Sequence, residues 1–499
     1  TIHNPIEKYD RKDKFCFAGA YYHKYPERAQ TFDALSDFFI SEKGLDIYDR
    51  NYLAPKAEYA FPDCYRAYIL GTLDPSEIDK AYKGYNYGIN MNSVNQSQTM
   101  FARRVFEMLS SNTVTIGNYS RGLKNLFGDL TICTNDVQTL SHAFKQYCSD
   151  SKFMHKYRLL GLRKVLSEHL YEYRLNYIVR KIYGREIKRS LPNVTLLAQP
   201  QPHELDSVLK AFHRQTYSKK HLILIGEYKE TEASNISVIS TKELQNKTIS
   251  SVISEGYIGI LDGKNYYGKN YLLDLALTLR YTQADGIGKY AYYSYDSSYG
   301  SQLVHPDCLY CNAEELKLDR SIFSWSFCKH LNISSFFEAS SLKGKDFFCI
   351  DEFNFCENFQ SEECPCVDDM VLSDQGIPLS SIEAAAEQIH PDMLSTSVSK
   401  ITCKEIAEHA PCPSHVTAVL NESGWNLKSE LKEKEVKYIY LDSFYETSEY
   451  AKNNKLNILF AGKGGLDLLG TCVFYNSSKE KLAPFFSKLN VLSSMDIPE

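Results

Sequence analysis

The sequence predicts an α/β protein built from several units, and three observations lead to this prediction. Apolar strands alternate with amphipathic helices over residues 14–148, a pattern typical of a doubly wound, mostly parallel sheet. The alternation starts again at Asn193, after a basic helical stretch. From about residue 436, short apolar runs are separated by Gly and Asn turns, which predicts a small β-rich module. The 499 residues suit two to four domains.

The first unit is expected to span residues 1–150. Its strands are predicted at 14–22, 44–50, 85–92 and 112–118, and its helices at 26–41, 76–84 and 99–110. The segment FAGAYY places Gly19 at the carboxyl end of the first strand, where open α/β sheets bind ligands.

Residues 151–192 are expected to form a basic linker helix. Between 152 and 189 there are 11 Lys or Arg and three Glu, with apolar residues at helical spacing. One interpretation is a connecting helix that packs on its domain and turns a basic face to water. The other is attraction to an anionic membrane or a lipid-phosphate acceptor.

A second α/β unit is expected over residues 193–375. Strands are predicted at 193–199, 221–227 and 258–261, with a helix at 202–217 and a Tyr-rich helix start after the polar turn that follows Asp262. Residues 376–435 are expected to be a linker or helical segment, within an acidic, Ser-rich stretch over 361–400. The module at 436–499 has predicted strands at 438–445, 456–464 and 470–476.

Composition excludes several classes of protein. A net charge of −6 argues against a general nucleic-acid binder. No apolar run is long enough to cross a bilayer, and the first 15 residues are too charged for a signal peptide. The 14 Cys are irregularly spaced, which favours reduced thiols and a cytoplasmic location. Seven of them fall between 308 and 366, where buried Cys and a structural zinc are alternative interpretations.

The segment NMNSVNQSQTMFARRVFEMLSSNTVTIGN carries the clearest local chemistry. A strand leads into a Gln-Ser-Gln-Thr turn and then a helix with Arg103, Arg104 and Glu107. Free N–H groups at a helix start suit a diphosphate, Arg offers a fork of donors for phosphate, and Glu107 could reach ribose hydroxyls. The alternative is a surface Arg pair beside a helix-stabilising Glu.

The segments SEKGLDIYDRNY, YRAYILGTLDPSEIDKAYKGYNYGINMNS, QTMFARRVFEMLSSNTVTIGNYSRG and LFGDL resemble the carboxyl-terminal half of CgeB-like, spore-maturation-type glycosyltransferases. The resemblance covers roughly residues 14–140. It implies a GT-B architecture, in which two Rossmann-like halves face each other and the carboxyl-terminal half holds a nucleotide-sugar donor. The acceptor-binding half is then expected upstream of this chain, or replaced by another element.

The same resemblance implies a set of donor-binding residues. Glu107 matches the acid that holds the ribose, and Thr99 stands where the family has a further acid. The other donor-binding positions are Gly19 and Ala20 in the first-strand turn, Arg28 near the diphosphate, Leu70 and Gly71 beside the base, the loop Gln98, Thr99, Met100 and Phe101, and the helix residues Arg103 and Arg104.

Residues 193–360 resemble family-two, GT-A-type glycosyltransferases, through HRQTYSKKHLILIGE, YIGILDGKNYYGKNYLLDLALTLRYTQADGIGK and IDEFNF. That family binds a divalent metal through several acids after the strand that ends here at Asp262. In this chain Lys264 and Asn265 replace acids, and the region of the family's catalytic base lacks one. Glu227 survives where an acid that binds the base of the nucleotide is common. We therefore expect a catalytically degenerate unit, with Mg or Mn disfavoured at Asp262; alternatively, Lys264 could hold phosphate as a fixed cation.

Taken together, the sequence predicts a glycosyltransferase of cell-surface polysaccharide synthesis. It would use a UDP- or GDP-sugar held by the first unit, with no metal required there, and a glycan or lipid-linked acceptor. It would be cytoplasmic, with peripheral contact at the inner face of the membrane through the 152–189 helix as an option, and would bind no nucleic acid. No catalytic base is identified. The alternative is a non-catalytic glycan-binding or scaffolding protein; an oxidoreductase is disfavoured because no G-x-G-x-x-G follows the first strand.

Overall fold

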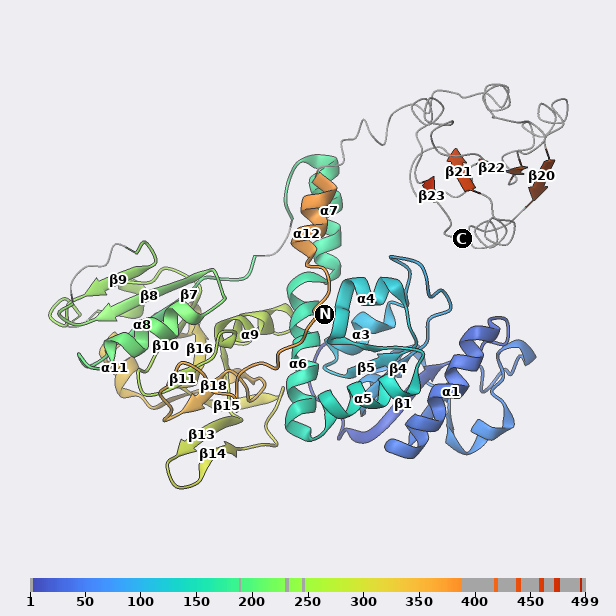
Figure 1. Cartoon of the computed structure of the whole chain (residues 1–499). Helices are drawn as coiled ribbons and strands as arrows, with labels where there is room; N and C mark the ends of the chain where they lie inside the picture. The colour runs from blue at the N-terminus through green and yellow to red at the C-terminus, as the bar shows by residue number, and fades with distance from the viewer. Residues whose placement is uncertain are drawn as a thin grey trace. The chain divides into compact units, whose positions relative to one another are not determined.

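The computed structural model describes residues 3–187, 190–228, 233–244 and 247–387, together with the backbone of five short strands between 417 and 495. The chain divides into two compact units, Thr1–Leu379 and Ser380–Glu499. The first unit contains two α/β bodies joined by a long helical segment, and Figure 1 shows one body on each side of that segment.

The first body is a six-stranded sheet in the order β3-β2-β1-β4-β5-β6, with every pairing parallel. This is the strand order of the Rossmann fold. Successive strands are added on one side of β1 up to β3 and on its other side from β4 onward, so the strand order reverses between β1 and β4. The strands are β1 (Lys12–Gly19), β2 (Leu45–Asp49), β3 (Ile69–Gly71), β4 (Tyr85–Asn90), β5 (Val114–Gly117) and β6 (Ile132–Cys133). The predicted doubly wound parallel sheet is therefore present.

Alternating side chains of β1 build the two cores of this body. Phe15 and Phe17 enter one core with the helices α1 and α5, whereas Cys16 enters the other with α2. The helices are α1 (Pro26–Glu42), α2 (Asp79–Lys83), α3 (Arg104–Ser110), α4 (Arg121–Phe127) and α5 (Val137–Cys148). Short 3-10 helices are η1 (Ala57–Tyr59), η2 (Asp63–Tyr68), η3 (Pro75–Glu77) and η4 (Gly128–Leu130).

The helix predicted at 99–110 begins later, at Arg104. Side chains capture the preceding backbone instead: Ser97 Oγ accepts from Met100 N, and Asn92 Oδ1 accepts from Ala102 N. These bonds hold the segment as a loop, because a Ser or Asn side chain offers the backbone an alternative to helical bonding.

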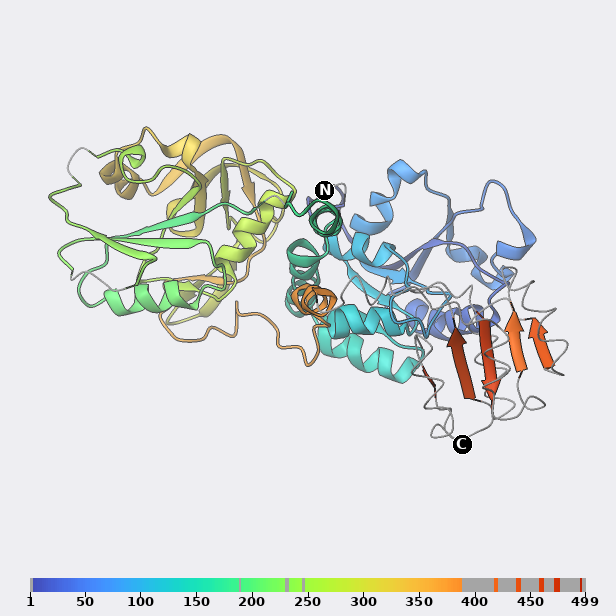
Figure 2. The same cartoon turned by 90° about the horizontal axis from the view of Figure 1, so that it is seen from above.

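The predicted basic linker helix is two helices, α6 (Ser151–Glu168) and α7 (Tyr171–Tyr183). Side chains of α6 enter the cores of both bodies, and Figures 1 and 2 show it lying between them. Four of its cations, Lys156, Arg158, Arg163 and Lys164, are buried. The expected basic face toward water is therefore wrong for α6.

The second body centres on an eight-stranded mixed sheet in the order β15-β17-β12-β16-β10-β7-β8-β9. Its strands are β7 (Val194–Ala198), β8 (Lys220–Ile225), β9 (Ile236–Ile239), β10 (Tyr257–Ile260), β12 (Gly286–Gly288), β15 (Asn312–Lys317), β16 (Ser321–Ser324) and β17 (Ser341–Cys349). Strands β10, β7, β8 and β9 are parallel, whereas β16 runs antiparallel to β10 and β12.

Helices and a second, smaller sheet complete this body. The four-stranded sheet has the order β11-β18-β13-β14. Its strands are β11 (Tyr266–Tyr267), β13 (Tyr292–Asp296), β14 (Gly300–Val304) and β18 (Phe355–Glu357), and the helices are α8 (Leu205–Arg214), α9 (Tyr271–Leu277), α10 (Trp325–Cys328), α11 (Ile333–Glu338), η5 (Ile249–Ser251), η6 (Thr278–Arg280) and η7 (Leu318–Arg320). The Tyr-rich helix start is thus wrong by one element: Tyr266 and Tyr267 pair with β18, and the helix begins at Tyr271.

Beyond α12 (Leu379–Glu387), the described backbone forms a five-stranded sheet in the order β20-β19-β22-β21-β23. Its strands are β19 (Thr417–Leu420), β20 (Lys437–Tyr440), β21 (Asn457–Ala461), β22 (Thr471–Tyr475) and β23 (Ser494–Met495). All pairings are antiparallel except that of β19 with β20. Within the described part of the chain, no helix is long and apolar enough to cross a membrane.

Candidate functional site

A cavity of about 880 Å³ opens where β1, β2 and β3 end. Of the residues predicted from sequence, Gly19, Arg103, Arg104 and Glu107 lie on its wall. The remaining wall comes from the ends of β2 and β3, from α2 with the turn before it, and from the amino-terminal segment. The carboxyl ends of strands next to the point where strand order reverses are where open α/β sheets bind ligands.

Glu107 is held at the wall of this cavity by three neighbours. Tyr82 Oη donates to Glu107 Oε2 over 2.9 Å, and Arg103 Nε lies 2.8 Å from Glu107 Oε1. His3 Nε2 is 4.0 Å from the same oxygen and stands edge-on to the ring of Tyr82. Glu107 lines the cavity and its side chain is 16% exposed. Its carboxylate can therefore accept a further hydrogen bond from a ligand hydroxyl.

Three arginines approach one another beside the end of β1. Arg28 on α1 is only 6% exposed, and its guanidinium donates weakly to Ala20 O at 3.4–3.5 Å. Its Nε has no hydrogen-bond partner among the described residues. Burial, together with the charges of Arg104 and Arg50, lowers the pKa of Arg28 to about 10, although Tyr22 opposes this shift. A buried cation without a carboxylate normally costs stability, so this cluster is suited to an anion.

The other predicted donor residues lie outside the cavity wall. Leu70 and Gly71 belong to β3, and the next residue, Thr72, reaches the wall. The loop Gln98, Thr99, Met100 and Phe101 leads to Ala102, which also reaches it. Within the loop, Met100 is exposed and Phe101 stacks on Phe106. Leu70, Gly71 and the loop 98–101 are therefore adjacent in sequence to residues that line the cavity, but do not line it themselves.

Sequence reasoning missed Arg50, Tyr82, Asp79 and His3, all of which line the cavity. Arg50 could have been found, because it directly follows a strand whose carboxyl end faces the same edge as Gly19. Tyr82 and His3 gave no signal, since their contacts with Glu107 join segments far apart in the chain.

A second cavity, of about 510 Å³, surrounds the predicted degenerate site in the other body. Asp262 and Lys264 line it, as do Asp319, Arg320 and Glu357, which sequence reasoning missed. Arg320 Nη1 donates to Asp319 over 3.3 Å and to Glu357 Oε1 over 3.0 Å. Its guanidinium lies 3.7 Å from the centre of the Tyr292 ring. A buried, stacked arginine therefore neutralises two of the acids nearest Asp262.

The donor set of this cavity does not fit a divalent metal. The carboxylates of Asp319 and Glu357 form ion pairs with Arg320, and Asp262 Oδ1 accepts a hydrogen bond from Lys264 N. Burial, with Glu357 and Asp262 nearby, raises the pKa of Asp319, although Arg320 opposes this. Across the described residues, no three His, Cys, Asp or Glu side chains gather as metal ligands. A fixed cation beside the acids would repel a metal ion.

Lys264, Asn265 and Glu227 take different places around this body. Lys264 is exposed, so the side chain is free to turn toward water. Asn265 is buried and donates to Asp319 Oδ2 over 3.2 Å. Glu227 is exposed beyond β8 and is not part of the cavity wall. The cation that stands among the acids is Arg320, which the sequence did not single out.

The Cys cluster forms close thiol pairs. Interaction with Cys349 lowers the pKa of Cys311 to about 7, and interaction with Cys356 lowers the pKa of Cys364. Because all seven Cys between 308 and 366 lie in the described part of the chain, and no metal-binding group is found there, the zinc interpretation gains no support.

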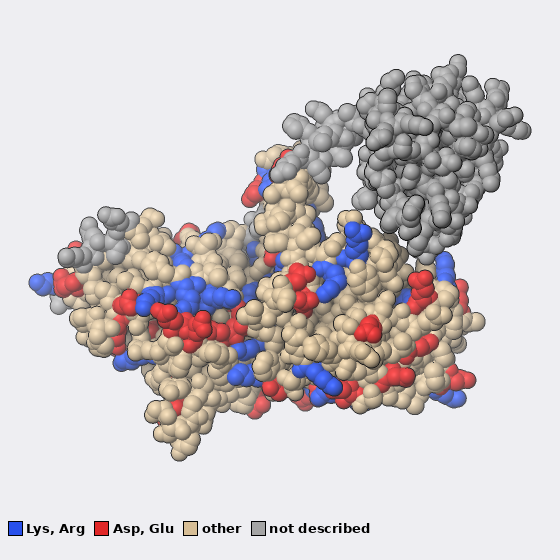
Figure 3. Space-filling model, in the orientation of Figure 1, with Lys and Arg blue, Asp and Glu red and all other residues tan. Residues whose placement is uncertain are grey.

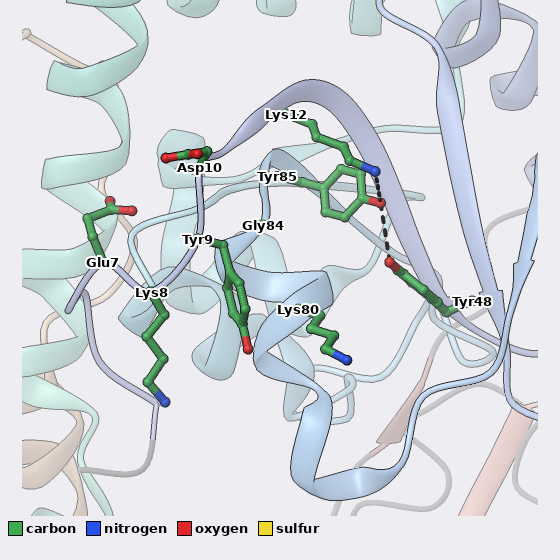
Figure 4. Close-up of a pocket in the computed structure, with 9 residues that line it drawn as sticks. All are labelled: Glu7, Lys8, Tyr9, Asp10, Lys12, Tyr48, Lys80, Gly84 and Tyr85. Atoms are coloured by element: carbon green, nitrogen blue, oxygen red, sulfur yellow. Dashed lines mark hydrogen bonds between the residues drawn. The ribbon is translucent and has the colours of Figure 1, made fainter. Parts of the chain in front are cut away.

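A third cavity, of about 690 Å³, lies at the opposite end of β1 and holds no residue predicted from sequence. Figure 4 shows its wall, where Lys12 and Tyr48 both approach the hydroxyl of Tyr85. Three lysines and two acids share this wall, so its charges largely compensate. Figure 3 shows the same mixing of basic and acidic side chains across the face that it displays.

A parallel sheet of Rossmann strand order, with an arginine-lined cavity where its strands end, defines a Rossmann-like class of α/β domain. Residues 40–180 match a family model described as glycosyl transferase-like. This segment is therefore a glycosyltransferase-like domain of the GT-B type, as the sequence resemblance implied.

No curated protein matches the chain. Among solved structures, the crystal structure of an alpha1,3-fucosyltransferase matches at 13% identity and a TM-score of 0.19, over 30% of this chain. The match spans 37% of that fucosyltransferase chain, and similarity at this level says nothing about fold or substrate.

Proposed function

We propose that this chain is a glycosyltransferase that takes a sugar from a UDP- or GDP-sugar and passes it to a glycan or lipid-linked acceptor. The observation that carries the proposal is the position of Arg50 and Arg104 on the wall of the cavity at the end of β1, with the buried Arg28 beside them. Arg50 and Arg104 belong to the residues 40–180 that match the glycosyl transferase-like model. A diphosphate is the part of such a donor that needs cations, and arginine binds it with paired hydrogen bonds.

Each wall of the cavity has a role in this proposal. Arg28, Arg50 and Arg104 would neutralise the diphosphate and stabilise it as it leaves, which is the largest expected contribution to the rate. Glu107 would accept hydrogen bonds from the ribose, next to Tyr82. No metal is needed for this arrangement, because arginines supply the positive charge. The base that takes the acceptor proton is not assigned to a residue.

The second body would then serve a non-catalytic role. Its parallel strands β10, β7, β8 and β9, followed by the antiparallel β16, support the proposed GT-A-like origin. Arg320 among Asp262, Asp319 and Glu357 supports the loss of its metal chemistry. This same observation favours the second candidate function, a glycan-binding or scaffolding protein in which neither body transfers sugar.

Titration calorimetry with UDP and with GDP tests the proposed donor site. Arg28→Met and Glu107→Ala should each weaken binding of the preferred nucleotide by ~10- to 100-fold, because each removes a hydrogen bond that involves a charged group. Arg66→Met, which changes an exposed arginine of η2 outside the cavity, is the matched control and should bind normally. Unchanged affinity in both Arg28→Met and Glu107→Ala would refute the site.

A donor-hydrolysis assay separates the two candidate functions. Slow release of UDP or GDP from a nucleotide-sugar by the wild-type chain, lost in Arg28→Met, supports the transferase. Binding to arrayed glycans without any release of nucleotide would favour the non-catalytic protein instead.

A further inference from the structure

Helix α7 carries a stripe of large apolar side chains that no described residue covers. Tyr171, Leu175, Ile178 and Ile182 are 78%, 54%, 51% and 66% exposed. Their spacing of four, three and four residues places all of them on one side of the helix. The opposite side is buried, through Tyr173 and Asn176. Since soluble proteins rarely leave such a continuous apolar stripe in water, this face is expected to have a partner.

Positive charge accompanies the stripe. Between 171 and 187 the sequence has four Lys or Arg and two Glu, within a chain whose net charge is −6. Lys181 and Arg180 both lie within 6 Å of the Tyr177 ring, and Arg185 lies over the Tyr183 ring just beyond the helix. The local excess of cations beside apolar side chains is complementary to an anionic surface with an apolar interior.

Tyrosines stand at both ends of the stripe. Tyr171 begins the helix and Tyr183 ends it, and both rings are exposed. A tyrosine ring has an apolar body and a polar tip, so it is favoured where hydrocarbon meets headgroups. Leu175, Ile178 and Ile182 supply aliphatic side chains between them.

We propose that α7 binds an anionic lipid bilayer, lying in its surface with Tyr171, Leu175, Ile178 and Ile182 inserted among the lipid chains. At 13 residues the helix is about 20 Å long, too short to cross the hydrocarbon core. Figure 1 shows α7 continuing beyond α6 and away from the sheets. The exposed fractions of its four stripe residues, between 51% and 78%, leave the stripe accessible to a partner.

A second copy of the chain fits this face less well. A two-helix seam needs apolar positions over three or four heptads, whereas this stripe covers fewer than two. The seam cannot be extended, because Gly184 takes a φ of +65° and ends the helix. A bilayer needs no such length, since each side chain inserts independently.

The binding itself does not depend on the proposed function. If the chain is also a glycosyltransferase, α7 would bring the donor cavity close to a lipid-linked acceptor. This role for α7 rests on the proposed function. The two proposals fail separately, because lipid binding and nucleotide binding are measured by different assays on the same variants.

Co-sedimentation of the full chain with vesicles tests the proposal. We expect weak binding to phosphatidylcholine vesicles and clear binding when phosphatidylglycerol is added, with a loss of binding as salt is raised. Ile178→Glu and Ile182→Glu should each reduce partitioning by at least ~10-fold, because a carboxylate must be buried at the interface. Arg185→Gln should reduce binding to the anionic vesicles alone.

Leu53→Glu is the matched control, because Leu53 is 82% exposed in the first body, away from α7. It should bind vesicles like the wild type, and all variants should keep the nucleotide affinity of the wild type. Equal vesicle binding by wild type and Ile178→Glu would overturn the proposal. So would a wild-type dimer in sedimentation equilibrium that Ile178→Glu dissociates, because the stripe would then be an interface between copies.

Discussion

Arg28 shows how a single side chain can point to a function. Its guanidinium is buried beside Arg104 and Arg50 without a carboxylate partner among the described residues. The guanidinium lies 4.5 Å from the centre of the Tyr22 ring, and a buried cation without a carboxylate is suited to an anion. The same reasoning identifies Arg320 as a structural cation, since it has two carboxylate partners and an aromatic ring beneath it.

His169 should make stability depend on pH. It is buried between α6 and α7 against Phe106 and Phe127, and its Nδ1 lies 3.2 Å from Arg174 Nη2. Burial, with Arg174 and Lys164 nearby, lowers its pKa to about 3. In the unfolded chain the same histidine takes up a proton below a pKa of about 6.5. As the pH is lowered from about 6.5 to about 3, the free energy of unfolding should therefore fall by up to ~1.4 kcal/mol per pH unit.

Urea unfolding between pH 7 and pH 5 measures this dependence. His169→Gln keeps a polar group near Arg174 but cannot take up a proton, so its stability should fall less steeply with acid than that of the wild type. His142→Gln, which changes an exposed histidine of α5, should leave the slope unaltered. Identical slopes for His169→Gln and wild type would show that His169 already protonates freely in the folded chain.

At the scale of elements, α6 holds the two α/β bodies together. Arg163 donates from Nε and Nη2 to the two oxygens of Asp274, and from Nη1 and Nη2 to those of Asp369. Burial alone would lower the pKa of Arg163, but these carboxylates raise it. Burial also raises the pKa of Asp274 to about 6, against the effect of Arg163. Arg163 therefore joins α6 to Asp274 of α9 and to Asp369.

Arg163→Met should lower the free energy of unfolding by about 3–5 kcal/mol, because two buried carboxylates would lose their shared cation. Adding Asp369→Asn to this variant should restore part of the loss, since only one carboxylate would then remain unpaired. Thermal and urea unfolding measure both effects. A small decrease in the free energy of unfolding of Arg163→Met would show that water reaches the carboxylates of Asp274 and Asp369.

The helix bounds show which parts of the secondary structure the sequence pattern predicts. Apolar spacing predicted α1 and α8 within a few residues and the helical character of the α6–α7 segment, because it depends on neighbours one or two turns away. The same pattern placed the start of α3 too early and merged α6 with α7. The bond from Ala102 N to Asn92 Oδ1 helps to hold the loop before α3, and α6 ends at Glu168 before α7 begins at Tyr171. Local spacing shows neither boundary.

At the scale of the whole molecule, the two α/β bodies present different chemistry at corresponding edges. The parallel sheet opens on a cavity whose wall carries Arg50, Arg103 and Arg104 together with the acids Asp74, Asp79 and Glu107. The mixed sheet opens on acids that are already neutralised by Arg320. The two cavities therefore differ in their charged groups: arginines without a buried carboxylate partner among the described residues lie beside the first, and carboxylates paired with Arg320 lie in the second.

Arg320→Gln should raise the affinity for Mn²⁺ by at least ~10-fold, because Asp319 and Glu357 would become available as oxygen ligands beside Asp262. Electron paramagnetic resonance of free Mn²⁺ measures this. Lys264→Gln should change the affinity much less, since Lys264 is exposed. A larger effect of Lys264→Gln would restore Lys264 as the cation that opposes a metal.

The sequence by itself determined the alternation of strands and helices, the parallel first sheet, and the absence of acids at the three positions that follow Asp262. These depend on residue type and short spacing, so they are readable along the chain. Only the tertiary structure brought Arg28, Arg50 and Arg104 together, and only it paired Arg320 with Glu357, 37 residues away, and Arg163 with Asp369, 206 residues away. Whether a charge is free for a ligand depends on such distant partners, because burial and pairing are properties of the folded chain.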